Sequence, residues 1–361
     1  MRHARTRVAL PRHPGGVLPA GVALVALLMA ALALVPTRAM AAAPPAQGGQ
    51  ALQPVSLRLD WLYQGPNSGF MAAREKGYYK DVGLDVTVAA GKGSVNTAQL
   101  VASKSDMFGY SDGYVVGTSV AKGMPIRMVA NVTRRTPTAA IVMADSDIKT
   151  PKDLEGKTVG IPPGGGPYHQ WPAYLKGCGI DSSKIKVAAM DPATAPSALI
   201  QGRVDGIVGF VNGFVPLIES RSGKKARFFP YADCGVSNVS LGVIVHNDLI
   251  KENPDLIRRF VAASMKGFLY VTKNREEAGQ IVKKYLETVN PATATRELEL
   301  SLDFYVTPNT KGMPFGWMSD KDWEDTVRIL KEYGGVTTPL EAKQLYTNEF
   351  VPTSAEYNYP Q

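Results

Sequence analysis

Residues 57–88 read LRLDWLYQGPNSGFMAAREKGYYKDVGLDVTV, and this stretch decides the fold class. Apolar and polar side chains alternate at its start, which is the period of a β-strand. Asn67 or Ser68 can cap a helix that we expect to extend to about Tyr79. The alternation returns over 84–88 as a second strand. A strand, a helix and a further strand in this order predict a parallel sheet with helices on its faces, the α/β class.

The same order of elements continues along the chain. The expected elements are, in chain order, a helix over 96–103, strands over 107–110 and 158–161, a helix over 168–176, a strand over 185–188, a helical turn over 197–201 and a strand over 206–210. Two such units predict two α/β lobes. From Asn253-Pro254, a good helix start, the pattern becomes helical, with apolar stripes at a spacing of four.

Composition and charge exclude several classes of protein. The chain has 361 residues, of which 45% are hydrophobic and 20% charged. These proportions are those of a globular protein and not of a disordered, collagen-like or polytopic membrane protein. The formal net charge is +8, which on its own suggests a nucleic-acid partner. Five of the arginines lie within residues 1–41, however, and the rest of the chain does not suggest a nucleic-acid partner.

The N-terminus has the pattern of a secretory signal. A basic start precedes an apolar run over 21–35, and Ala39-Met40-Ala41 is a small-x-small cleavage pattern. The run is short for a membrane anchor, which is the alternative. We therefore expect residues 1–41 to be a signal peptide and 42–52 a flexible lead-in. Cleavage removes five arginines and no acids, so the exported chain has a net charge of +3 and no basic run for nucleic acid.

The histidines and cysteines give no metal motif. Cys178 and Cys234 are the two cysteines of the chain, and two cysteines do not make a zinc site without histidine ligands. An oxidising compartment permits one disulfide, but the sequence does not establish that the two residues are close. We expect free thiols, with a disulfide as the alternative.

The candidate site follows from where ligands bind in open parallel sheets, which is outside the carboxyl ends of the strands. The candidates are residues that follow the predicted strands of both units: Asp60, Trp61, Tyr63, Asn67, Ser111, Asp112, Gly164, Gly165, Gly166, Tyr168, Phe210 and Asn212. Aromatic members can stack on a flat ring, and Asp and Asn members can bond its substituents. The glycine run at a predicted helix start can present backbone N–H groups to an anion.

Structural alternatives accompany these residues. Asp60 can cap a turn, Trp61 can belong to a core, and the glycine run can be a plain turn, since no Gly-Lys-Ser/Thr follows it. The segment Gly91-Lys92-Gly93-Ser94 favours a solvated turn. Enzyme motifs are absent from the sequence: there is no Gly-x-Ser-x-Gly, no His-Glu-x-x-His and no Cys/His cluster. We expect a binding protein without catalytic residues, cofactor or metal.

Several segments resemble one known family. The stretch 57–88 is similar to the opening of periplasmic solute-binding proteins of ABC importers, in the branch related to thiamine-pyrimidine synthesis proteins that also holds riboflavin, sulfonate and nitrate binders. Further similar segments are LVASKSDMFGYSD (100–112), IKTPKDLEGKTVGIPPGG (148–165), LIQGRVDGIVGF (199–210) and KGMPFGWMSDKDWEDTVRIL (311–330). The likeness covers about 53–335.

The resemblance implies a type II periplasmic binding protein fold, with two α/β lobes joined by a two-crossing hinge. Lobe 1 is then about 53–141 plus 244–361 and lobe 2 about 142–243, with crossings near 139–143 and 241–245. It also implies a soluble monomer outside the cytoplasmic membrane that passes one small ligand to an ABC permease and contacts the membrane only through it.

The resemblance also narrows the ligand. In this family an Asp-Trp pair after the first strand often lines a pocket for a flat heteroaromatic ring, and Asp60-Trp61 matches that pair. Relatives often have Pro-Asn close behind it, whereas here Tyr63-Gln64-Gly65 intervenes before Pro66-Asn67. An aromatic or heteroaromatic nutrient, pyrimidine- or vitamin-precursor-like, is thus the expected ligand. Sulfonates, nitrate-like anions and aromatic carboxylates are the alternatives.

The family also includes enzymes that build the thiamine pyrimidine, using a cysteine-rich motif and a lysine-held pyridoxal cofactor. This chain has no such cysteine cluster and begins with an export pattern. A thiamine-pyrimidine-synthesis-like enzyme is therefore the alternative of another class.

Overall fold

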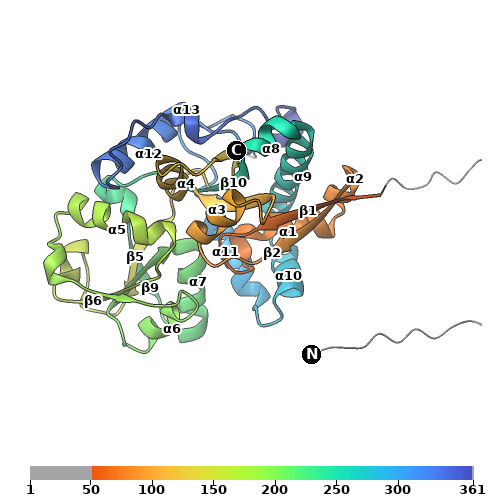
Figure 1. The fold of residues 1–361 in the computed structure, drawn as a ribbon. Coiled ribbons are helices and arrows are strands. Elements are labelled where there is room, and N and C mark those ends of the chain that lie inside the picture. Colours follow the sequence, from red (N-terminus) through yellow and green to blue (C-terminus); the bar gives the residue numbers. More distant parts are fainter. Residues whose placement is uncertain (1–50, 360–361) are drawn as a thin grey trace, which may run out of the picture. The chain divides into compact units, whose positions relative to one another are not determined.

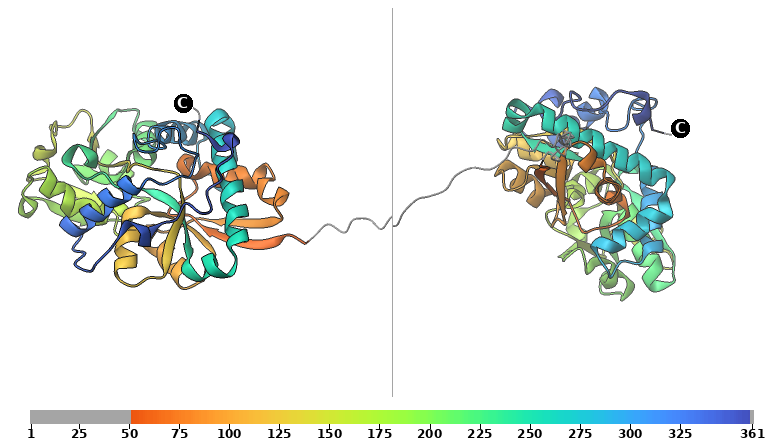
Figure 2. Two further views of the ribbon diagram at one scale, coloured as in Figure 1. Left: turned by 90° about the horizontal axis from the view of Figure 1, so that it is seen from above. Right: turned by 90° about the vertical axis from the view of Figure 1, so that its right-hand side faces the viewer.

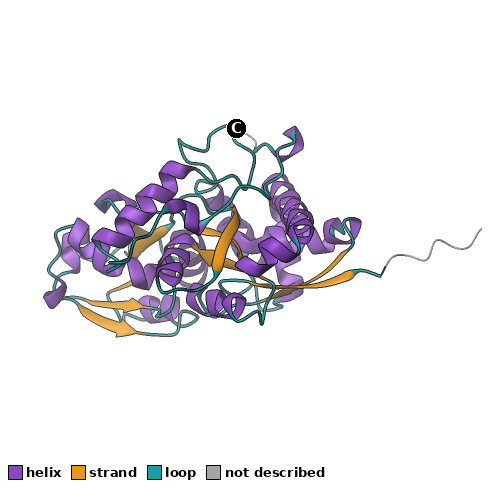
Figure 3. Cartoon of the chain, turned by 45° about the horizontal axis from the view of Figure 1, so that its top comes forward, coloured by secondary structure: helices purple, strands orange, loops and turns teal. Residues whose placement is uncertain are grey.

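The computed structural model describes residues 51–359, and the expected signal peptide and its cleavage site lie outside this range. The described chain contains two five-stranded sheets flanked by helices (Figures 1 and 3). The strands of the first sheet, in spatial order, are β2 (Leu84–Ala89), β1 (Gln53–Arg58), β3 (Phe108–Asp112), β10 (Leu241–His246) and β4 (Ile126–Asn131). Those of the second are β7 (Lys186–Ala189), β6 (Thr158–Ile161), β8 (Gly206–Phe210), β5 (Thr138–Met143) and β9 (Ala226–Pro230).

The helices that follow the strands are α1 (Ser68–Glu75), α2 (Tyr78–Asp81), α3 (Ser94–Ala102), α4 (Gly113–Ala121), α5 (Gly166–Gly177), α6 (Ala195–Ile200) and α7 (Val211–Ser222). The C-terminal helices are α8 (Asn247–Glu252), α9 (Pro254–Lys273), α10 (Arg275–Tyr285), α11 (Pro291–Leu302), α12 (Asp320–Glu332) and α13 (Ala342–Leu345). Short 3-10 turns are η1 (Gly65–Asn67), η2 (Pro151–Leu154), η3 (Ser182–Lys184), η4 (Tyr231–Cys234) and η5 (Ala355–Tyr357). Among helices in residues 51–359, none is long and apolar enough to cross a membrane.

Each sheet combines a parallel part, as expected, with antiparallel strands. β1 pairs in parallel with β2 and β3, and β6 pairs in parallel with β7 and β8. β10 inserts antiparallel between β3 and β4, and β5 inserts antiparallel between β8 and β9. The sequence pattern missed these insertions because a buried strand looks the same in either direction.

The chain passes between the sheets twice, over 132–137 and over 231–240. The expected crossings near 139–143 and 241–245 coincide with β5 and β10, and each of these strands pairs within one sheet only. A strand's ladder of hydrogen bonds ties it to its sheet, so the change of sheet occurs in the loops before these strands. The lobe boundaries given above stay predictions.

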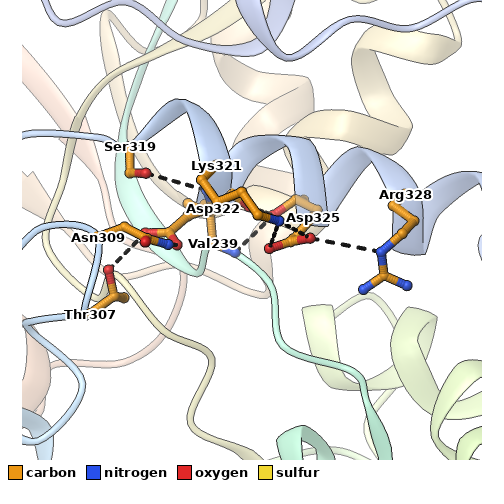
Figure 4. Close-up of polar contacts among 9 residues, drawn as sticks. Val239, Thr307, Asn309, Ser319, Lys321, Asp322, Asp325 and Arg328 are labelled. Atoms are coloured by element: carbon orange, nitrogen blue, oxygen red, sulfur yellow. Dashed lines mark hydrogen bonds and ion pairs between the residues drawn. The ribbon is translucent and has the colours of Figure 1, made fainter.

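The second crossing is anchored to α12 (Figure 4). The backbone N–H of Val239 donates to Thr326 Oγ1 at 2.9 Å, and that hydroxyl donates to the carbonyl of Asp322. The Asp322 carboxylate accepts bonds from Thr307 and Asn309, at 2.8 and 2.6 Å. The C-terminal helices therefore hold the crossing in place from outside the two sheets.

Apolar packing explains the layers. α1 and α9 lie together on one face of the first sheet (Figure 2), where Phe260 stacks on Phe108 with ring centroids 3.8 Å apart. A second buried cluster joins residues of both sheets, including Met128 from β4 and Val159 from β6. The two lobes thus share an apolar core beside the site described below.

Two expectations on local structure need correction. The helix expected from 67 to 79 ends at Glu75, because Gly77 takes φ 78° and restarts the chain as α2. The expectation of free thiols was also wrong: Cys178 and Cys234 form a disulfide with a Cα–Cα distance of 5.0 Å. The two residues are 56 positions apart, and only the packing of α5 on η4 brings them together.

Candidate functional site

A pocket lies where the parallel strands of both sheets end, and it encloses about 610 Å³ of space not filled by atoms, part of it open to solvent. Its first-lobe residues follow β1 and β2. Its second-lobe residues follow β6 and β7 or belong to the end of β8 and the start of α7. The lining residues are Asp60, Trp61, Gln64, Gly93, Ser94, Pro162, Pro163, Gly165, Gly166, Pro167, Pro192, Val208, Gly209, Phe210, Gly213 and Phe214. The location agrees with the rule that ligands bind outside the carboxyl ends of parallel strands.

The structure brings five of the predicted site residues into this lining: Asp60, Trp61, Gly165, Gly166 and Phe210. Asp60 and Trp61 lie two and three residues after the end of β1, the glycines begin α5, and Phe210 ends β8. They come from both lobes, so the pocket is complete only when the lobes are together.

Other predicted residues support the first-lobe wall from behind. Tyr63 donates from its hydroxyl to the carbonyl of Val88 at 3.0 Å. Asn67 donates to the carbonyl of Leu62 at 2.9 Å and accepts from the backbone N–H of Gln64. These two residues therefore shape the loop that carries Asp60 and Trp61, although neither is among the lining residues.

The remaining predicted residues also lie outside the lining. Ser111 donates to the carbonyl of Ser94 at 3.2 Å, and Gly164 accepts from the N–H of Val95 at 3.2 Å. Asn212 faces α11, where its amide donates to Ser301 Oγ at 2.8 Å. The exposed Tyr168 lies against His169, and Asp112 is buried behind Gly166. We read Ser111 and Asp112 as following the strand, but they are the last two residues of β3, and both are fully buried.

Sequence reasoning missed several lining residues. Gly93 and Ser94 were taken for a solvated turn, yet they pack on the second lobe: a Cβ on Gly93 would lie 2.9 Å from the carbonyl oxygen of Gly164. Phe214 lies in the first turn of α7, four positions after its N-cap Phe210, a spacing that could have suggested a shared side. No sequence pattern marks the four lining prolines as members of the site. The position of Gln64 in the lining follows only from the fold of η1.

Asp60 is the one carboxylate in the lining, and within residues 51–359 the lining includes no Lys, Arg or His. Burial raises the pKa of Asp60 to about 7, and the nearby charge of Asp112 adds to the rise. Hydrogen bonds from the backbone at Asp60 and Trp61 oppose it. Near neutral pH the pocket therefore presents an acceptor that is only partly ionised.

Asp112 lies just behind the pocket wall. Its carboxylate accepts from Ser240 Oγ at 2.9 Å and from the N–H of Tyr114 at 3.0 Å. Gln170 of α5 donates to it at 3.4 Å. Burial raises the pKa of Asp112 to about 6, and the hydrogen bonds from Ser240 and from the backbone of Tyr114 and Val115 limit the rise.

A second hollow is lined by Arg134, Arg135, Asp322, Asp325 and Arg328, among others. Its acidic groups already have partners: Asp325 pairs with Lys321 and Arg328, as Figure 4 shows. Over residues 51–359 no group of three or more His, Cys, Asp or Glu side chains is arranged to hold a metal ion. The interlobe pocket is therefore the candidate site.

The chain is also similar to known proteins. A sequence model of the family described as NMT1/THI5 like matches residues 66–278, more than half of the chain. The riboflavin-binding protein RibY of Chloroflexus aurantiacus is 26% identical, with 93% of this chain and 97% of the relative covered. The formylaminopyrimidine-binding protein of Halalkalibacterium halodurans is also 26% identical, with 90% and 98% covered.

One similar protein has a name that denotes an enzyme, the 4-amino-5-hydroxymethyl-2-methylpyrimidine phosphate synthase of Legionella pneumophila. It is 22% identical over 82% of this chain and 92% of its own. Among solved structures, the putative periplasmic sulfonate-binding protein SsuA of Methylobacillus flagellatus KT superimposes with a TM-score of 0.60 and 18% identity. It covers 83% of this chain and 93% of its own. The expected periplasmic binding protein fold, with two α/β lobes and two crossings, is confirmed.

Proposed function

Because the chain belongs to the NMT1/THI5-like family, we propose that it is an extracytoplasmic solute-binding protein of an ABC importer. Its ligand is a small aromatic or heteroaromatic nutrient of the pyrimidine or vitamin-precursor kind. The observation that carries this proposal is the pairing of Asp60 with Trp61 in a pocket whose lining, over residues 51–359, has no cationic side chain. The protein works as a monomer and hands the ligand to the permease.

The polar chemistry of the pocket favours a ligand that donates N–H groups. A buried carboxylate needs hydrogen-bond donors, and those of Asp60 are the backbone N–H groups of Asp60 and Trp61. A ring N–H or an amino group can supply the rest. The formylaminopyrimidine that the relative from Halalkalibacterium halodurans is named for has such a group.

The apolar part of the pocket favours a flat ring. Trp61, Phe210 and Phe214 offer aromatic faces or edges, and prolines 162, 163, 167 and 192 offer stiff apolar walls. Such surfaces bury a planar ring at little entropic cost, because neither the ring nor the prolines have many rotamers to lose. An aliphatic sulfonate uses this surface poorly.

Anionic ligands remain the second candidate because sulfonate binders share the fold. They would rely on the backbone N–H groups of Gly165 and Gly166 at the start of α5. The two buried carboxyl groups, Asp60 and Asp112, oppose an anion there. Electrostatics therefore supports the neutral or cationic ring over the anion.

We further propose that the protein has no enzymatic activity. Closure of the two lobes around the ligand is the functional event, and the hydrogen bond from the N–H of Val95 to the carbonyl of Gly164 is one of the contacts between them. A ligand that binds the closed form more tightly shifts the population towards it, and the permease recognises that form. Product formation from any bound compound would contradict this part of the proposal.

A ligand panel tests the function directly. We expect an aminopyrimidine or a related N–H-bearing heteroaromatic compound to raise the melting temperature of the exported chain, whereas benzenesulfonate and nitrate do not. At 100 times its dissociation constant a ligand adds about 2.7 kcal/mol to the free energy of unfolding, enough for a clear thermal shift. A shift with the anions alone would overturn the proposed ligand class.

Trp61→Ala should weaken binding of the ring compound by roughly 1–3 kcal/mol, because an aromatic anchor in the pocket is lost. Isothermal titration with the tightest ligand of the panel measures the change. Trp317→Phe is the matched control, since Trp317 is partly buried and lies outside the lining. Equal affinity of Trp61→Ala and the wild type would remove Trp61 from the site.

A further inference from the structure

Two helices begin at one buried carboxylate. Asp112 is the N-cap of α4, and its Oδ1 accepts from the N–H of Tyr114 at 3.0 Å. The same carboxyl lies against the first turn of α5: a Cβ on Gly166 would be 2.8 Å from Asp112 Cγ. Gln170, one turn further along α5, reaches it with its side-chain amide. Asp112 is fully buried at this junction.

The junction joins the two lobes. Asp112 ends β3 of the first sheet, and α5 follows β6 of the second. Gly166 needs its lack of a side chain here, since any Cβ would collide with the carboxyl group. The carboxylate therefore reaches the start of α5 only when the lobes are together, as they also must be for ligand binding.

The charge at this point is balanced. The first turn of a helix has a partial positive charge of about half an elementary charge, so two helix starts together call for about one negative charge. Asp112, which lies against Gly166 and is not a lining residue, supplies it, while Gly165 and Gly166 at the same helix start line the pocket. A ligand in the pocket thus meets a helix end whose charge is already compensated.

We propose that Asp112 is a specificity-determining residue that excludes anionic ligands, because its carboxylate occupies the positive end of α5 that an anion would otherwise use. The inference rests on the proposed binding function and adds a residue that sets the charge of the ligand without touching it. The inference also gives a role to the acid that lies behind the start of α5 in this chain, which has the same fold as the sulfonate-binding SsuA.

Asp112→Asn tests this with two probes of the same shape and different charge, benzoate and benzamide. Asparagine keeps the size of the side chain and an acceptor for Tyr114, but removes the negative charge. Binding is measured by ligand-observed NMR at pH 8.5, where Asp60 and Asp112, with pKa values of about 7 and about 6, are ionised in the wild type. We expect the affinity for benzoate relative to benzamide to rise about tenfold, the effect of one charge at a partly buried helix end.

Relocating the charge separates its effect from a structural one. Gln170 Nε2 lies 3.4 Å from Asp112 Oδ1, so Asp112→Asn with Gln170→Glu restores a carboxylate at nearly the same point. This double variant should return the benzoate-to-benzamide ratio to the wild-type value. Asp147→Asn, an exposed acid of the second lobe, changes the net charge equally and should leave the ratio unchanged.

If Asp112→Asn does not fold, Gln170→Lys neutralises the same carboxylate by pairing with it and should raise the ratio in the same direction. An unchanged ratio in the folded variant, a wild type that already prefers benzoate, or a pocket that takes neither probe overturns the inference. A ratio that rises in a protein for which no heteroaromatic ligand is found would uphold the inference and count against the proposed nutrient class instead.

Discussion

Asp60→Ala is expected to weaken binding of the N–H-bearing ring by about 2–5 kcal/mol, the loss found when one partner of a buried, charged hydrogen bond is truncated. The cost is large because the donor of the ligand stays buried in a pocket that offers few other acceptors. Asp60→Asn keeps one acceptor and should lose less. Asp85→Asn, an exposed acid on β2, is the charge-matched control and should bind as the wild type does. Isothermal titration at pH 8 measures all four proteins.

The same residue gives the binding a pH dependence. The ionised carboxylate of Asp60 is the acceptor, and burial raises its pKa in the ligand-free protein to about 7. Below pH 7 the ligand must first displace a proton, so its affinity should fall by up to tenfold per pH unit; above pH 7 it should level off. For a ligand that does not itself titrate, Asp60→Asn should flatten this profile. An affinity that declines above pH 7 would contradict the role of the ionised form.

The ligand-free protein should show the opposite trend in stability. The folded state holds a proton on Asp60 between about pH 4 and 7 that the unfolded chain has already lost, so the free energy of unfolding falls as pH rises through this window. Asp112 acts in the same direction, with a pKa raised to about 6. Urea unfolding at pH 5 and pH 8 measures the difference, which should shrink in Asp60→Asn.

Removal of the disulfide has the largest expected effect on stability. The bond between Cys178 and Cys234 closes a loop with a sequence separation of 56. A loop of this length corresponds to about 4 kcal/mol of unfolding free energy in the chain-entropy account of disulfides. Cys178→Ser with Cys234→Ser should lower the free energy of unfolding by about this amount.

Urea unfolding with and without a thiol reductant checks the disulfide prediction. The reductant should lower the stability of the wild type to that of the double variant and leave the double variant unchanged. The bond links the end of α5, whose start lines the pocket, to η4 at the beginning of the second crossing. A loss below about 1 kcal/mol would mean that the unfolded chain is already compact between these positions.

The sequence predicted the elements around the site well where local signals were strong. The strand over 206–210 has the observed bounds of β8, and the helix and strand expected at 168–176 and 185–188 differ from α5 and β7 by one or two residues. Apolar alternation, glycine and proline act within a few residues, so they can be read locally. The rule that ligands meet strand ends then led to Asp60, Trp61 and Phe210.

The sequence did not predict the direction in which individual side chains point. Asn212 lies in the chain between the lining residues Phe210 and Gly213, but its amide is bonded to Ser301 of α11. Asp112 ends β3, but its carboxylate lies at the junction of two helices instead of in the pocket lining. Side chains alternate between the two faces of a strand and turn by about 100° per residue in a helix. A shift of one residue in β3 or α7 would therefore point these side chains in a different direction.

The chain by itself therefore determined the α/β class, the two units and the strand ends where a ligand would lie, since these follow from local periodicity and turn chemistry. Tertiary structure alone decided that Cys178 bonds to Cys234, that β5 and β10 insert antiparallel, and that Asp112 stands behind Gly166. Each of these depends on residues far apart in sequence meeting at distances of a few ångströms, and only the packing of the whole chain sets such distances.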